Sequence, residues 1–279
     1  MLQNSRRILA KTSHRLNEQH VTTVKTFGFL VHPNINISSP SLKVADICTG
    51  TGIWLSDVAK TLPSTCSFVG YDISFSTFPS ESTLPKNVTF KTQDMLLPFP
   101  EEELGSYDLV AVRFVSVATT RTEWGRAIEN LTTLLKPGGW LQWIDSCNYN
   151  LYNSIAGTSR AANQELYDSL APFRMKEDLV IGVMIREPGR LFREKVLMEK
   201  RLVDVHEDVF STDRLPGMRE MGTRNMIMCF KQYLEDLVKI QGSGWTLERV
   251  DKLCKDALEE VDAGVYHTLD QVCVIGRKA

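Results

Sequence analysis

The sequence lacks paired cysteines, long apolar runs and an excess of charge of either sign. Its six cysteines are scattered over 279 residues with no C-x-x-C pair, which argues against a disulfide framework and against structural zinc. No run of about 18 apolar residues is present, so no membrane span is expected. A formal net charge of −2 argues against the broadly basic surface that nucleic-acid binding needs. The first residues lack the apolar core of a signal peptide, which predicts a cytoplasmic protein.

A glycine turn without a third glycine is the most informative segment of the chain. A short, mostly apolar stretch over residues 44–48 is followed by the turn at residues 49–52, and an amphipathic stretch begins at once. This order predicts a strand, a turn and a helix start, the arrangement with which parallel α/β sheets hold nucleotide-like cofactors. Gly50 and Gly52 allow a positive φ and a close backbone approach to a ligand. The dinucleotide fingerprint G-x-G-x-x-G needs a third glycine where this chain has Leu55.

Further strands with polar ends follow at regular intervals. Residues 66–73 predict a buried strand with Asp72 near its end, and an acidic side chain there suits both hydroxyls of a ribose. Residues 87–95 predict a third strand that also runs into an acidic residue, and residues 107–114 predict a fourth. The order and spacing extend the α/β pattern that the glycine turn begins.

The segment 134–143 supplies a second specific signal. A Lys-Pro-Gly-Gly sequence at 136–139 stands between an apolar helix end and an apolar strand, which predicts a glycine C-cap with a proline stop before a fifth strand. With the glycine turn, these features make residues 42–146 resemble the class I S-adenosylmethionine-dependent methyltransferases. The resemblance implies an α/β fold with a Rossmann-like, seven-stranded, mostly parallel sheet. It also implies an N-terminal helical lid and a helical insertion after strand five.

The same resemblance implies S-adenosylmethionine as cofactor, S-adenosylhomocysteine as product and no metal. Asp46 fits the family's acidic strand end, and the turn is expected to hold the amino-acid end of the cofactor by backbone groups. In the family, an Asp at the place of Asp94 takes the adenine amino group and the next residue packs on the ring. Arg113 is expected to reach the cofactor carboxylate or the methyl acceptor. The expected cofactor-binding residues are Asp46, Thr49, Gly50, Thr51, Gly52, Asp72, Ile73, Asp94, Met95 and Arg113.

Shorter stretches are similar to one subgroup, the small-molecule methyltransferases of fungal secondary metabolism. They lie at residues 15–20, 112–114 and 138–143. Within the subgroup the chain looks most similar to the S-methyltransferases that cap dithiols of gliotoxin-type metabolites. This implies methyl transfer to a thiol of a small-molecule secondary metabolite. Many relatives have Glu directly after the tryptophan of strand five, where this chain has Ile144 and then Asp145.

Other acceptors and roles stay open. One alternative is O- or N-methylation of another metabolite, and a second is a regulatory protein that binds the cofactor and methylates nothing. A related form uses the positive charge of the cofactor to catalyse a rearrangement. A nicotinamide dehydrogenase is the last alternative, but the chain lacks the third glycine and any Tyr-x-x-x-Lys pair.

Several methyltransferase types and partners are disfavoured. The chain has no Asp/Asn-Pro-Pro-aromatic tetrad after strand four, no Pro-Cys dipeptide and no matching carboxylate pair for magnesium. These absences argue against nucleobase amino-group, cytosine-C5 and catechol methylation. The expected partner is a small-molecule substrate, with no nucleic acid and no membrane, and the protein is expected to be a monomer or a weak homodimer.

The whole chain, 1–279, is predicted to form one domain. Its expected parts are an N-terminal helical lid (1–31), the cofactor-binding core (42–146), a helical substrate cap (147–200) and the C-terminal part of the sheet with inserted helices (201–279). Helices are predicted over 158–170, 188–198, 218–240 and 247–261, and strands over 201–209 and 266–276. The acidic triplet at 101–103 is predicted to be a solvated loop.

Catalysis by a base is not required for every acceptor. A thiol with a reference pKa of about 8.5 needs little help to ionise, whereas a phenol or alcohol needs more. His20 is the preferred candidate for a base or orienting donor because it lies in the segment expected to cover the methyl group. His14, His267 and Tyr149 are the other candidates.

Overall fold

The computed structural model describes residues 2–115, 119, 121–169, 202–240 and 242–279. In this part of the chain, one seven-stranded sheet has the order β3-β2-β1-β4-β5-β7-β6. β1 to β5 are parallel, and β7 is antiparallel to both of its neighbours. The Rossmann-like, mostly parallel sheet predicted from the sequence is therefore confirmed. The strands are β1 (Lys43–Ile47), β2 (Ser67–Asp72), β3 (Val88–Thr92), β4 (Tyr107–Arg113), β5 (Leu135–Asn153), β6 (Leu202–Ser211) and β7 (Val265–Lys278).

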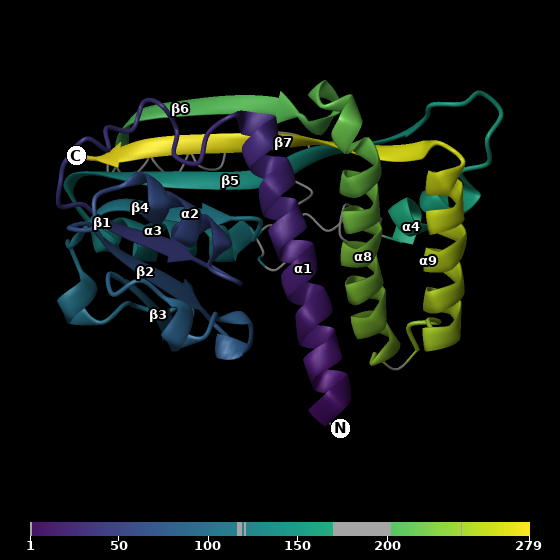
Figure 1. Ribbon diagram of the computed structural model, residues 1–279, viewed down its shortest axis with the longest axis horizontal. Coiled ribbons are helices and arrows are strands. Elements are labelled where there is room, and N and C mark those ends of the chain that lie inside the picture. The colour runs from purple at the N-terminus through teal and green to yellow at the C-terminus, as the bar shows by residue number, and fades with distance from the viewer. Residues whose placement is uncertain (1, 116–118, 120, 170–201, 241) are drawn as a thin grey trace.

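The described helices fall into two groups (Figure 1). α2 and α3 pack on the sheet, whereas α4, α8 and α9 stand together at one end of it, and α1 lies between that group and the parallel strands. β5 and β7 are long enough to run from the sheet into the second group. None of the described helices is long and apolar enough to cross a bilayer. Their bounds are α1 (Leu2–Phe27), α2 (Ile53–Thr61), α3 (Arg121–Leu134), α4 (Ala161–Ser169), α8 (Arg219–Val238) and α9 (Leu247–Asp262).

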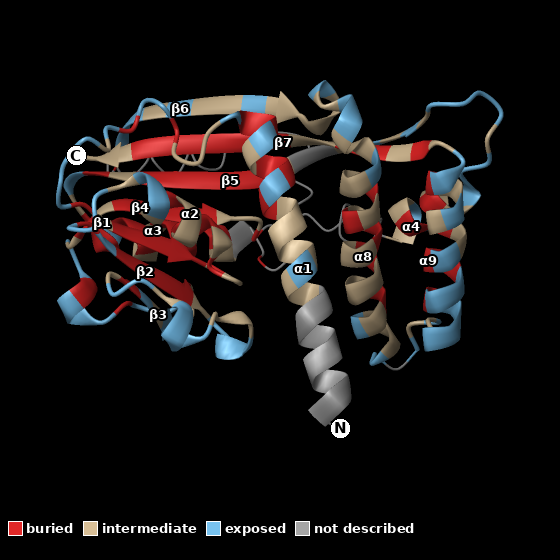
Figure 2. Cartoon of the chain, in the orientation of Figure 1, coloured by how far each residue is buried: buried red, intermediate tan, exposed pale blue. Residues whose placement is uncertain are grey.

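Buried apolar side chains form three clusters. Figure 2 colours all buried residues red. Val44 and Leu109 belong to one cluster, and their chain neighbours Ala45 and Val110 to the other, on the opposite face of the sheet. Successive side chains of a strand point to opposite faces, so strands covered on both sides need a continuous apolar run. The third cluster lies between α4, α8 and α9 and centres on residues such as Leu234.

The Lys-Pro-Gly-Gly segment is the irregular start of β5 rather than a helix cap. α3 ends at Leu134 and β5 begins at Leu135. The carbonyl of Leu134 accepts a hydrogen bond from the backbone N–H of Ser106 at 2.9 Å, so the turn before β4 satisfies the helix end. A Cβ on Gly139 would lie 2.8 Å from the carbonyl oxygen of Tyr107. The glycine is therefore needed for a close approach to β4.

The segment after residue 146 differs from the prediction. A helical cap is predicted from residue 147, but residues 147–153 continue β5, and residues 149–153 pair with β7, with Tyr149 opposite Leu269. Pairing satisfies the backbone groups of the extension, and Tyr149 packs against the helical cluster. α4 corresponds to the helix predicted at 158–170, whereas the helix predicted at 188–198 lies outside the described residues.

The remaining elements lie close to their predicted positions. α1 covers most of residues 1–31, and β6, α8, α9 and β7 occupy the segments predicted after residue 200. β3 ends at Thr92, two residues before Asp94, so Asp94 and Met95 follow the strand instead of ending it. Both are therefore held in a loop at the carboxyl end of the strand.

Glu103 corrects the prediction of a solvated acidic loop. Its side chain is only 4% exposed, and its carboxylate accepts hydrogen bonds from Lys43 Nζ at 2.9 Å, from the Tyr107 hydroxyl at 2.6 Å and from Lys91 Nζ. Burial acts to raise the pKa of Glu103, but these three donors lower it to about 2. The charge of the triplet predicted an exposed loop. The sequence could not show the burial of Glu103, because its donors come from β1, β3 and β4 and meet only in the folded sheet.

Candidate cofactor and acceptor site

The glycine turn lies at the carboxyl ends of β1 and β2, in a conformation that favours glycine. Gly50 and Gly52 have φ values of 56° and 68°, in the left-handed region. The backbone N–H of Thr49 donates to the carbonyl of Tyr71 at 2.9 Å, which joins the turn to β2. A Cβ on Gly52 would lie 2.3 Å from Cζ of Phe90. The backbone of the turn is thus held in place, and no Cβ at Gly50 or Gly52 blocks the approach of a ligand to it.

Asp72 connects β2 to the glycine turn. One carboxylate oxygen accepts from the backbone N–H of Gly50 at 2.8 Å, and the other accepts from that of Ser74 at 3.2 Å. The adjacent Ile73 and the nearby Phe75 are 69% and 76% exposed. An acidic side chain next to exposed apolar surface suits a ligand that combines a ribose with a flat ring.

Asp46 is buried beneath the turn. Its side chain is 1% exposed, and its carboxylate accepts from the hydroxyl of Thr49 at 2.6 Å. Burial raises the pKa of Asp46 to about 6, although nearby Arg113 favours the ionised form. Asp46 therefore holds the turn from below and adds negative charge to this end of the sheet.

α1 crosses over the turn and contacts it directly. The hydroxyl of Thr51 donates to Asn17 Oδ1 at 2.7 Å. His20, one turn further along α1, is 3% exposed and lies between two charged residues. Its Nε2 is 3.0 Å from an oxygen of Asp57, and its Nδ1 is 3.1 Å from Nη1 of Arg113. The helix is thereby attached to α2 and to the end of β4.

The hydrogen bonds define the protonation of His20. A guanidinium only donates, so Nδ1 must accept and Nε2 must carry the proton given to Asp57. Burial, followed by the positive charge of Arg113, lowers the pKa of His20. The imidazole is therefore neutral, and both of its nitrogens are bound inside the protein. Acting as a base would require His20 to give up one of these two contacts.

Arg113 has a donor that the described residues do not satisfy. Its Nε is buried and has no hydrogen-bond partner among them. Burial lowers the pKa of Arg113, while the negative charges of Asp46 and Asp57 oppose that shift. An unpaired, buried guanidinium N–H favours an anionic group. The carboxylate of S-adenosylmethionine is such a group, so the residues at this site fit the cofactor expected from the sequence.

Asp94 and Met95 lie near the same edge of the sheet, in different environments. Asp94 is half-buried, and its carboxylate accepts from the backbone N–H of Leu96 at 2.9 Å. Met95 is only 6% exposed, and its sulfur lies 3.6 Å from the sulfur of Cys48 in the core. Asp94 is therefore available at the surface of the site, whereas Met95 mainly supports it from behind.

Asp145, which follows Trp143 and Ile144 in β5, has a defined contact. Its side chain is fully buried, and its carboxylate accepts from the backbone N–H groups of Val115 at 3.1 Å and Ser146 at 2.9 Å. It therefore joins the ends of β4 and β5.

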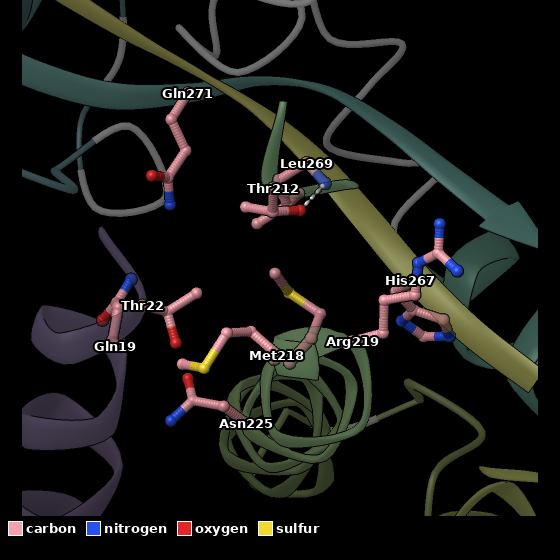
Figure 3. A pocket seen from close by; sticks show the side chains of 11 residues that line it. Gln19, Thr22, Thr212, Met218, Arg219, Asn225, His267, Leu269 and Gln271 are labelled. Carbon is pink, nitrogen blue, oxygen red and sulfur yellow. Dashed lines mark hydrogen bonds between the residues drawn. The ribbon is translucent and has the colours of Figure 1, made fainter. Parts of the chain in front are cut away.

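A pocket opens beside this edge, between α1, α8 and β7 (Figure 3). Two residues predicted as alternative bases or orienting donors lie at this pocket. His267 lines it, and the Nδ1 of His267 is hydrogen-bonded to the hydroxyl of Tyr149. His14 instead is largely exposed and lies 3.5 Å from Glu18. The pocket is lined by Gln19, Thr22, Thr212, Met218, Arg219, Gly222, Asn225, Met226, His267, Leu269 and Gln271.

Asn17 and Gln271 are site residues that the sequence did not reveal. Asn17 meets Thr51 across 34 positions of the chain, and Gln271 meets Thr23 across 248. Asn17 lies in the stretch 15–20 that resembles the subgroup, but that stretch gave no role for its side chain, and Gln271 belongs to no motif. The sequence predicted the last strand, β7, but it did not show that α1 covers the face of β7 that carries Gln271.

One further cluster has ligand-like side chains. His32, His206 and Asp208 have their potential metal-binding atoms within 4.8 Å of one another. The backbone N–H of Asn34 donates to Nδ1 of His32 at 3.1 Å, so Nε2 carries the proton and donates it to Asp208 at 2.7 Å. In this arrangement the cluster is a hydrogen-bonded link between β6 and the segment after α1.

Comparisons with known proteins place the chain in a family. A family model described as a methyltransferase domain matches residues 44–139. The N-methyltransferase tcpN of Claviceps purpurea is 39% identical over 198 residues, which cover 70% of this chain and 67% of that protein. The N-methyltransferase gliN of Aspergillus fumigatus is 29% identical over 261 residues, covering 89% and 87%. A solved structure of phosphoethanolamine N-methyltransferase 2 of Haemonchus contortus with S-adenosyl-L-methionine has a TM-score of 0.49 and 12% identity. That match covers 91% of this chain but only about half, 52%, of the other.

The sheet order, the glycine turn and the matched domain define a class I methyltransferase. The chain belongs to the S-adenosylmethionine-dependent methyltransferases and is an enzyme of that class. Within it, the chain is related to N-methyltransferases of fungal secondary metabolism.

The acceptor atom predicted from the sequence needs correction. Both relatives described above are named N-methyltransferases, and neither name refers to sulfur. The comparisons thus favour the alternative of a nitrogen acceptor over a thiol.

Proposed function

We propose that this protein methylates a nitrogen atom of a small-molecule secondary metabolite, with S-adenosylmethionine as the methyl donor. The observation that carries the proposal is the 39% identity to an N-methyltransferase across two thirds of that protein's length. The pocket beside the cofactor end of the sheet supports it, because the pocket suits a small acceptor.

Residues around the turn would each bind a different part of the cofactor. Asp72 would accept from the ribose hydroxyls, and the exposed Ile73 would pack against the adenine ring, with Asp94 near its amino group. The backbone of the turn and Nε of Arg113 would hold the amino-acid end. His20 would keep Arg113 in place from α1, which makes it a positioning residue in this proposal.

The chemistry requires alignment more than proton transfer. When bound, the cofactor supplies an electrophilic methyl group on a sulfonium sulfur. The lone pair of the acceptor nitrogen forms the new N–C bond, the S–C electron pair leaves with sulfur, and a proton of the nitrogen passes to solvent. A neutral amine needs no base for the attack, so the protein's task is to hold nitrogen, carbon and sulfur in line.

The acceptor atom can be tested with matched compounds. An arylalkyl amine, alcohol and thiol that share one carbon skeleton are incubated with the protein and trideuteromethyl S-adenosylmethionine. We expect mass spectrometry to find the label on nitrogen in the amine and little label in the other two. Labelling of the thiol or the alcohol alone would contradict the nitrogen assignment.

Asp72→Ala tests the cofactor site. Loss of the charge-assisted hydrogen bonds to the ribose and to Gly50 should weaken S-adenosylhomocysteine binding by about 1–3 kcal/mol, roughly 5- to 150-fold. Isothermal titration calorimetry measures the change, and Asp168→Ala, in α4, is the control. Equal affinities of the two variants would remove Asp72 from the ribose role.

A further inference from the structure

We infer that the pocket between α1, α8 and β7 holds the methyl acceptor, with Gln271 orienting the reacting nitrogen and His267 anchoring the far end of the molecule. The inference rests on the proposed N-methyltransferase function and adds the polar groups that the acceptor must carry. It follows from the position of the pocket, from two unsatisfied polar atoms and from their spacing.

One strand supplies the floor of the pocket. His267, Leu269 and Gln271 alternate along β7 and so point to the same face. Figure 3 shows Gln271 and His267 on opposite sides of the pocket, with Leu269, Thr212 and Met218 between them. Four residues of a strand span about 13 Å, which sets the separation of the two Cα atoms.

The Gln271 end lies next to the cofactor site. Gln271 pairs with Ser146, the residue directly after Asp145 at the end of the parallel part of β5. Its side-chain Nε2 donates to the hydroxyl of Thr23 at 3.4 Å, and Thr23 lies on α1 three residues after His20. Since His20 contacts Arg113 at the end of β4, this side of the pocket is the one nearest to the reacting groups.

The pocket contains two buried polar atoms without partners. Gln271 and His267 are 3% and 5% exposed, and Gln271 Oε1 and His267 Nε2 have no hydrogen-bond partner among the described residues. Other polar side chains of the lining are satisfied within the protein: the hydroxyl of Thr22 donates to a carbonyl, and Asn225 donates to the carbonyl of Arg15. A buried unsatisfied group is costly, so these two atoms indicate a ligand that completes them.

The orientation of the Gln271 amide follows from its neighbours. The Thr23 hydroxyl donates to the carbonyl of Gln19 at 2.8 Å, so its oxygen is left to accept from Gln271 Nε2. The unpaired atom of Gln271 is therefore the carbonyl oxygen, an acceptor. A substrate N–H bound to it would direct the nitrogen lone pair away from Gln271, as the methyl transfer requires.

The His267 end offers the opposite polarity. Burial lowers the pKa of His267 to about 3 and raises that of Tyr149 well above its usual value, so both groups are neutral near pH 7. An imidazole nitrogen is a better acceptor than a phenol oxygen, so the Tyr149 hydroxyl donates to Nδ1. Nε2 then carries a proton and is a donor towards the pocket.

The acceptor molecule should match this arrangement. It has an N–H group at one end, an apolar middle that contacts Leu269, Met218 and Met226, and a hydrogen-bond acceptor such as a carbonyl at the other end. Para-acetylphenethylamine has these features, and para-ethylphenethylamine has the same shape without the carbonyl. The two amines form a matched pair of probes.

Kinetics of three variants test the assignment. Gln271→Met should lower kcat/KM for both amines by about tenfold or more, with a fall in kcat, because it removes the group that orients the nitrogen. His267→Phe should raise KM for the acetyl compound alone, with kcat unchanged, because it removes an anchor distant from the reaction. Gln142→Met is the control, since Gln142 is a buried glutamine of β5 whose amide is bonded to His32 and Leu30.

Stability separates a substrate-binding role from a structural one. Gln142→Met should lower the urea midpoint of unfolding because it breaks satisfied hydrogen bonds. In the described part of the chain, Gln271→Met loses only the 3.4 Å bond to Thr23 and removes a buried unpaired oxygen, so it should leave the midpoint unchanged or raise it. Binding of S-adenosylhomocysteine should be the same in the Gln271 variant and the wild type. Unchanged kinetics of both pocket variants would overturn the inference.

A binding measurement separates this inference from the proposed function. In protein with ¹³C-methyl methionine and bound S-adenosylhomocysteine, either amine should shift the signals of Met218 and Met226, while that of Met95 stays in place. If nitrogen is not methylated but these signals shift, the proposed function fails and the pocket assignment stands. If neither signal shifts at millimolar amine, the pocket assignment is wrong whatever the acceptor atom is.

Discussion

Gly52→Ala should lower both the stability of the protein and its affinity for S-adenosylhomocysteine. Alanine at φ 68° costs about 1–2 kcal/mol. The added Cβ would also lie 2.3 Å from the ring of Phe90, and crowding of this kind costs about 1–3 kcal/mol. The turn or the ring must move, so we expect a total loss of about 2–5 kcal/mol divided between unfolding and binding.

The two contributions can be measured separately. Gly28→Ala is the matched control, because Gly28 has a φ of 83° and a Cβ added there would have no neighbour within 4 Å. It should show the backbone cost without the steric one. Phe90→Ala in the Gly52→Ala background should restore part of the cofactor affinity. Urea unfolding and calorimetry give the two quantities, and wild-type affinity in Gly52→Ala would show that the turn does not hold the cofactor.

Glu103→Gln should destabilise the protein by up to about 3 kcal/mol at pH 7. The pKa of Glu103 is lowered from the reference value of 4.5 to about 2, and each unit corresponds to about 1.4 kcal/mol. Removing the charge leaves Lys43 and Lys91 facing a neutral group and weakens the link between β1, β3 and β4.

The pH dependence gives this prediction a sign. The unfolded state binds a proton at Glu103 below pH 4.5, whereas the folded state resists protonation until about pH 2. The stabilisation is therefore complete above pH 4.5 and is lost as the pH falls from 4.5 through 2. Urea unfolding at several pH values should show a shallower acid loss for Glu103→Gln than for the wild type. The control, Glu101→Gln, changes an exposed residue of the same triplet, and equal behaviour of the two variants would contradict the buried role of Glu103.

The sequence predicted the parts of this protein that depend on residues close together in the chain. The Thr-Gly-Thr-Gly turn was visible because left-handed backbone needs glycine at defined positions. Strands such as β1 and β4 were visible because sheets covered on both faces require continuous apolar runs. The order of these local signals carries the resemblance to class I methyltransferases, and that resemblance implied the seven-stranded fold.

The sequence was misleading where partners come from distant segments. Three adjacent glutamates predicted a solvated loop, yet Glu103 is buried because β1, β3 and β4 bring donors to it. His20 was predicted as a base or orienting donor, and nothing in the sequence indicated that Asp57 and Arg113 contact its two nitrogens. The extension of β5 past residue 146 depends on pairing with β7, more than a hundred residues later.

By itself, the sequence determined the backbone of the glycine turn, the class of fold and the acidic residues at the strand ends, since each is encoded by neighbouring residues. Only the tertiary structure decided which polar atoms remain unsatisfied. Gln271 and His267 share a face of β7 beneath α1 and α8, and their free atoms become apparent once every other partner is placed. Hydrogen-bond satisfaction depends on the whole fold, so the proposed acceptor site depends on the packing of segments that are distant in the sequence.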